Sequence, residues 1–140
     1  MARYQASSRW ITVLRIFDGL YFVWRGIFKL YTPTSVWLVP RVTAALPTTP
    51  LASIIRADIF PHVAAFGLTV GIIELICGSL LLLSWGGRIP PLVLALLNLI
   101  FFLTLGFKEP HDMELNLLMG TMNLMFASTM VRKPRHAKAA

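Results

Sequence analysis

Apolar residues gather into four long runs along the chain, and turn-forming or charged residues separate these runs. The runs cover about residues 10–31, 61–85, 90–107 and 112–131. A helix needs roughly 20 apolar residues to cross the hydrocarbon core of a bilayer, and each run is near that length, although the third is short. The pattern predicts one all-α domain over residues 1–140. We expect a four-helix antiparallel transmembrane bundle in which residues 32–60 form a long first extracytoplasmic loop.

The first run carries charged residues that recur at steps of three and four, so they share one face of a helix. These residues are Arg15, Asp18, Arg25 and Lys29. A charge at the centre of a bilayer costs roughly 2.5–3.5 kcal/mol on insertion scales. We therefore expect this face to point into the interior of the bundle.

The other runs place small and polar residues at the same helical steps, which lets helix backbones approach closely. Gly67, Gly71, Glu74 and Gly78 form such a face in the second run, and Asn116, Gly120, Asn123 and Ala127 form one in the fourth. Depths counted at about 1.5 Å per residue predict one intramembrane polar layer. Its members are Arg15, Asp18, Glu74, Asn98 and Asn123. In this layer Arg15 is expected to bridge Asp18 to Glu74.

A second polar group is expected near the outer face, beneath the loop of residues 32–60. Its members, the candidate ligand- or quinone-binding residues, are Arg25, Lys29, His62, His111 and Glu114. Glu114 is the expected partner of Arg25 or Lys29, and a histidine could exchange a proton near neutral pH. The alternative is that the buried charges only fix how the helices pack. The loop is either an interfacial segment or a lid over this site.

Composition and charge agree with a membrane protein. The chain has 140 residues, 56% of them hydrophobic and only 14% charged, compared with about 25% charged in soluble domains. The net charge of +7 gathers at the chain ends, as "ARYQASSR" and "VRKPRHAK", so nucleic acid is not an expected partner. Lysine and arginine near span ends mark the cytoplasmic side, which predicts an inner-membrane protein with both termini cytoplasmic. Arg41 and Arg56, in the first loop, oppose this orientation.

Three segments resemble the DoxX-like family of membrane proteins. They are "LRIFDGLYFVWRGIFKL" in the first run, "ELICGSLLLLSWGGR" in the second and "EPHDMELNLLM" before the fourth. The resemblance covers residues 11–130 and departs in the long first loop. It implies a four-helix membrane bundle, similar to the small subunit of an archaeal thiosulfate:quinone oxidoreductase, to members of thiol-stress complexes or to assembly factors. It assigns no catalytic residue here.

Several functional classes compete for this pattern. A disulfide-generating quinone reductase needs cysteine pairs, and Cys77 is the single cysteine of the chain. Haem ligation by His62 and His111, a metal site near His111 and a small multidrug transporter are each less favoured. No metal and no intrinsic cofactor are expected, although a quinone could bind. We expect a non-catalytic accessory subunit that anchors or completes a larger electron-transfer complex, with lipid and other membrane subunits as partners. The alternative is a quinone-linked oxidoreductase subunit with a small-molecule site near the outer face.

Overall fold

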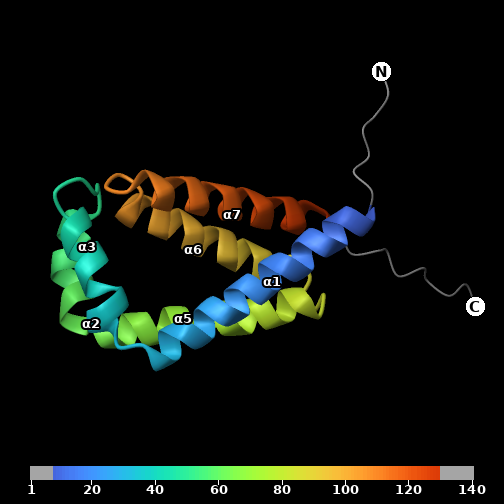
Figure 1. The fold of residues 1–140 in the computed structure, drawn as a ribbon, viewed down its shortest axis with the longest axis horizontal. Coiled ribbons are helices and arrows are strands. Elements are labelled where there is room, and N and C mark those ends of the chain that lie inside the picture. Colours follow the sequence, from blue (N-terminus) through green and yellow to red (C-terminus); the bar gives the residue numbers. More distant parts are fainter. Residues whose placement is uncertain (1–7, 130–140) are drawn as a thin grey trace, which may run out of the picture.

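The computed structural model describes residues 8–129, and this part of the chain is helical with no β-strand. Its long helices are α1 (Ser8–Tyr31), α5 (Val63–Leu82), α6 (Ile89–Leu105) and α7 (Pro110–Thr129). They run in alternating directions along the chain (Figure 1). The predicted all-α class is confirmed, and these helices begin and end within three residues of the predicted runs.

The long helices form two pairs, α1 with α5 and α6 with α7. Glycines let the backbones of α1 and α5 touch: a Cβ on Gly26 would lie 2.6 Å from the Leu75 nitrogen, and one on Gly78 would lie 2.9 Å from the Val23 nitrogen. The predicted small-residue face of the second run is therefore confirmed as a helix contact. The two pairs are separated at one end of the molecule, where the segment between α1 and α5 lies (Figure 1).

This connecting segment is helical for much of its length. It contains α2 (Thr34–Trp37), α3 (Val39–Ala45), α4 (Ala52–Ile54), the π-helix η1 (Ile55–Ile59) and the 3-10 helix η2 (Phe60–His62). Its apolar residues Trp37, Val42 and Ile55 are buried together with Leu105 of α6. The apolar pattern in the predicted loop of residues 32–60 therefore reflects packing onto the helices. The helical stretch that contains α5 begins at Ala52, earlier than the predicted start at residue 61.

Proline and glycine set the ends of the last two helices. Pro90 and Pro91 lie in the first turn of α6, where their missing N–H groups leave no hydrogen bond unmade. Ser84, Gly86 and Gly87 have left-handed backbone angles, with φ of 57°, 80° and 59°. These angles reverse the chain between α5 and α6.

Three charged side chains lie inside the fold, whereas many large apolar side chains lie on its surface. Asp18 and Lys29 of α1 are buried, whereas Phe17 and Trp24 on the same helix are 67% and 62% exposed. Within residues 8–129, the helix from Ala52 to Leu82 is long and apolar enough to cross a membrane. Two of the other predicted spans do not meet this criterion by length and composition. Helix α6 has only 17 residues, and α1 carries four charges in its apolar stretch. The basic residues before residue 8 and after residue 129 lie outside the described part.

Candidate functional site

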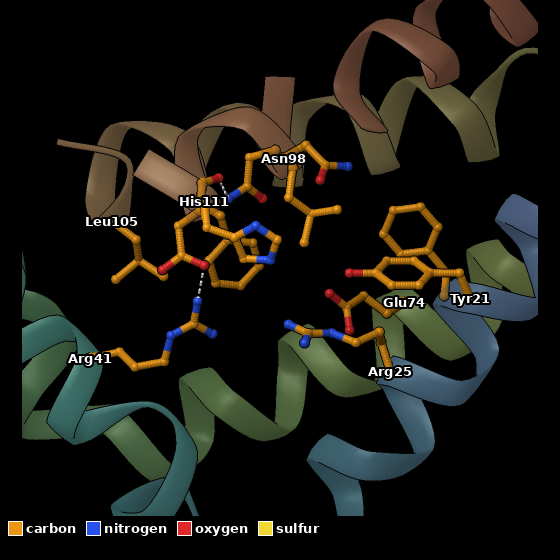
Figure 2. Close-up of a pocket in the computed structure, with 12 residues that line it drawn as sticks. Tyr21, Arg25, Arg41, Glu74, Asn98, Leu105 and His111 are labelled. Carbon is orange, nitrogen blue, oxygen red and sulfur yellow. Dashed lines mark hydrogen bonds and ion pairs between the residues drawn. The ribbon is translucent and has the colours of Figure 1, made fainter. Parts of the chain in front are cut away.

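A polar cavity of about 220 Å³ lies where the two helix pairs face each other. Side chains from α1, α3, α5, α6 and α7 line it, and Figure 2 shows several of them pointing toward its centre. Its polar members are Tyr21, Arg25, Arg41, Glu74, Asn98, His111, Asp112 and Asn116. A concave site with a few convergent polar groups is the usual form of a small-molecule site.

Behind the cavity, Lys29 of α1 and Glu74 of α5 form a buried ion pair. Their side chains are 0% and 4% exposed. The Lys29 Nζ atom also lies 4.7 Å from the ring centre of Phe101 and 5.2 Å from that of Trp37. One cation is thus held by a carboxylate and two aromatic rings, which compensates for the loss of its hydration.

This pair corrects two predicted partners. Arg25 or Lys29 was expected to pair with Glu114, and Glu74 with Arg15. These pairings are wrong, because Lys29 pairs with Glu74 and Arg15 with carbonyls of α5. A helical side chain leans toward the N-terminus of its own helix, and for Lys29 this is the direction in which the antiparallel α5 runs toward its C-terminus. Lys29, whose Cβ lies opposite Gly71, therefore reaches Glu74 one turn further along α5.

A second ion pair joins Arg41 of α3 to Asp112 of α7 (Figure 2). The Asn116 side chain donates a hydrogen bond of 2.6 Å to the Asp112 carbonyl, one turn earlier on α7. This pair ties the segment between α1 and α5 to the start of α7 at the edge of the cavity. Arg41 was considered only for the orientation of the chain in the membrane, and its place in the cavity wall was not predicted.

Arg25 is the cation of the cavity wall that has no carboxylate partner within ion-pair distance among residues 8–129. Its guanidinium carbon lies 5.9 Å from the ring centre of Tyr21. Because the two ion pairs each sum to zero, Arg25 leaves the cavity with one excess positive charge. Glu74 adds a complementary group, since its Oε2 atom is buried with no hydrogen-bond partner in the described chain.

The predicted outer group is only partly brought together. Arg25 and His111 line the cavity, and Lys29 lies behind it through Glu74. His62 and Glu114 are exposed and do not line it. Two residues turn a helix by about 200°, so Glu114 lies on the opposite face of α7 from Asp112.

The predicted intramembrane layer is divided between two levels. Arg15 donates to the carbonyls of Leu81 and Leu82 at the end of α5, where helix carbonyls lack helical partners. Asp18 interacts with the Asn123 side chain, although neither carboxylate oxygen has a hydrogen bond of normal geometry within residues 8–129. The expected bridge from Arg15 through Asp18 to Glu74 is therefore wrong.

The two remaining members of the predicted layer, Asn98 and Asn123, are buried. Asn98 lines the cavity, as Glu74 does, and its side-chain nitrogen donates to the Leu94 carbonyl at 2.8 Å. The Asn123 nitrogen donates to the Met119 carbonyl at 3.0 Å. The predicted layer put Glu74 level with Asp18, whereas Glu74 pairs with Lys29, about three turns further along α1.

Comparisons of the chain with protein-family models, curated proteins and solved structures found no match. The resemblance to DoxX-like proteins therefore stays a prediction. Within residues 8–129, no group of three or more histidine, cysteine, aspartate or glutamate residues is placed to hold a metal ion.

The chemistry of the cavity follows from its charges. An excess arginine charge attracts an anionic or carbonyl oxygen, and the fork of a guanidinium can donate two hydrogen bonds to it. The free Glu74 oxygen accepts a hydrogen bond from a hydroxyl or N–H group. The cavity is therefore suited to a small molecule with a carbonyl or anionic oxygen, to which a hydroxyl or N–H group would add a second contact.

Proposed function

We propose that the chain is an integral membrane protein, a DoxX-like four-helix transmembrane bundle with both termini cytoplasmic. It serves as a non-catalytic subunit that anchors or completes a larger membrane complex of the electron-transfer type. The observation that carries this proposal is the inverted distribution of polarity, with ion pairs inside and large apolar side chains outside. Lipid accepts apolar side chains, whereas charged groups in a bilayer must face one another.

Helix lengths support the proposal. At about 1.5 Å per residue, α1 is about 36 Å long and α5 about 30 Å, close to the hydrocarbon thickness of about 30 Å. The charges that keep α1 from meeting a simple hydropathy criterion face inward. A helix of this kind crosses lipid as part of an assembled bundle.

The outer faces of α6 and α7 support a role beside other subunits. An apolar groove lies between these helices, with Ala95 and Gly120 among its lining residues. Small residues let a helix of another subunit approach closely, and such contacts drive association within lipid. The electron-transfer context rests on the DoxX-like resemblance.

Membrane extraction and one-sided labelling test the membrane proposal. We expect the protein to stay in the pellet after alkaline carbonate treatment. With the native cysteine replaced by serine, a cysteine at Arg88 should react with an impermeant maleimide only from the cytoplasmic side, and one at Ser53 only from outside. Extraction into the soluble fraction would refute the proposal, and reversed labelling would refute the orientation.

Purification in a mild detergent tests the subunit role. We expect other membrane proteins to co-purify in fixed ratio, as identified by mass spectrometry. A lone monomer that carries full redox activity after reconstitution would refute a non-catalytic role.

A second candidate function is favoured by the cavity itself. We propose that a small molecule with carbonyl or anionic oxygens, such as a quinone head group, binds there through Arg25. Arg25→Gln should then weaken binding of 2,3-dimethoxy-5-methyl-1,4-benzoquinone at least about tenfold while the protein still assembles. Arg56→Gln, which changes an exposed arginine of η1, is the matched control and should bind as the parent does. Equal binding by all three proteins would refute this use of the cavity.

A further inference from the structure

An apolar cleft of about 200 Å³ adjoins the polar cavity. Its wall includes Leu38, Val42, Ile55, Ile59, Ile100 and Thr104, so it lies between the segment that precedes α5 and the helix α6. Phe101 lines both the cleft and the polar cavity. The two spaces are therefore neighbours that share one aromatic side chain.

Helical segments of the fold form the walls of the cleft. Protein interiors are packed as closely as organic crystals, so an apolar space of this size needs an occupant or a reason. The π-helix η1 contributes Ile55 and Ile59 to its wall, and π-helical turns occur frequently at functional sites. Ile54, also in the wall, is 51% exposed, so the cleft reaches the outer surface of the molecule.

The polar cavity specifies the other end of an occupant. Arg25 supplies an unbalanced positive charge, and the buried Glu74 Oε2 atom lacks a donor in the described chain. Each space alone is smaller than the roughly 300–1,000 Å³ of typical ligand pockets, whereas together they fall within that range.

We propose that the cavity and the cleft together bind one amphiphilic molecule with a single apolar chain. Its head places a carbonyl or anionic oxygen at Arg25 and a hydroxyl or N–H donor at Glu74, and its chain passes Phe101 into the cleft. The inference rests on the proposed binding of a small molecule in the cavity, to which it adds the chain and the donor. An opening toward the apolar outer surface lets such a molecule enter from lipid.

Three esters test the proposal on the full chain in nanodiscs. Methyl 4-hydroxybenzoate supplies the head alone, octyl 4-hydroxybenzoate adds the chain, and octyl 4-methoxybenzoate removes the donor. We expect the octyl ester to bind at least about tenfold more tightly than the methyl ester, with both dissociation constants corrected for partition into lipid. The methoxy compound should bind at least about fivefold more weakly than its hydroxyl counterpart. Equal binding of these two compounds would overturn the role of Glu74.

A variant that fills the cleft separates the chain from the head. Thr104→Trp should remove the gain in affinity that the octyl chain provides and leave the affinity for the methyl ester unchanged. Ile76→Trp, at an exposed position of α5 away from both spaces, is the matched control and should keep the gain. A gain that persists in Thr104→Trp overturns the proposal.

A labelling experiment on the unmutated protein keeps the test independent of folding. An octyl ester with a diazirine at the end of its chain should label the peptides that contain residues 55–59 or 100–104. Labelling elsewhere overturns the chain site. Binding of the methyl ester that depends on Arg25, without any gain from the chain, overturns this inference and leaves the proposed cavity function intact. If neither the methyl ester nor the octyl ester binds, the amphiphile site is overturned. The esters then give no support to the proposed cavity function.

Discussion

The ion pair between Lys29 and Glu74 offers the sharpest test of how α1 is held against α5. Lys29→Met removes the ammonium group and keeps most of the apolar stem, so Glu74 becomes a buried carboxylate without its cation. Loss of one partner from a buried pair costs about 3–5 kcal/mol, because the other charge stays desolvated. The exposures of 0% and 4% place this pair at the buried end of the range. We therefore expect Lys29→Met and Glu74→Leu each to lower the free energy of unfolding by about that amount.

The double variant decides whether the cost comes from the stranded charge. Replacing both partners by apolar residues of similar volume is often neutral or stabilising, so Lys29→Met with Glu74→Leu should be less destabilised than either single variant. Unfolding by denaturant titration in one detergent gives the four free energies of the cycle. Arg25→Met, a cation on the same helix without an ion pair, is the control and should cost much less. Additive single and double effects would refute the reasoning.

Two further predictions concern the contacts around the site. Gly26→Ala would place a methyl group 2.6 Å from a backbone nitrogen of α5. Overpacking of this kind typically costs about 1–3 kcal/mol. The midpoint temperature of thermal unfolding should therefore fall clearly, whereas Leu20→Ala on the outer face of α1 should not lower it. Arg41→Gln breaks a pair whose arginine side chain is 38% exposed, so its cost to the free energy of unfolding should stay below about 1 kcal/mol. A loss above about 2 kcal/mol would mean that the contact between Arg41 and Asp112 holds the segment before α5 in place.

The sequence predicted the long helices well because their signals are local. Apolar runs of the right length, prolines at helix starts and glycines at helical steps each depend on residues a few positions apart. The contact of Gly71 and Gly78 with α1 followed from the same spacing. These features specify which face of each helix is small and which is polar.

The partners of the charges were predicted poorly because they depend on register between distant helices. Lys29 and Glu74 are separated by 45 positions and Arg41 and Asp112 by 71. The level of Glu74 depends on how α5 lies against α1, where Gly71 faces Lys29, and the reach of the lysine side chain adds another turn. The cleft beside Phe101 also depends on how the segment before α5 folds, and its apolar residues alone did not distinguish packing onto helices from contact with a membrane surface.

The charges in the apolar stretch of α1 lead to different conclusions about function. Arg15 donates to the last carbonyls of α5, and Lys29 pairs with Glu74 of α5. These two charges thus fix α1 against α5, and a purely structural role accounts for them. Arg25 lies on the same face, yet it points into a cavity where the neighbouring ion pairs already balance. A half-buried guanidinium that forms no ion pair within residues 8–129 needs a different reason to be there, and an oxygen of a bound molecule supplies one.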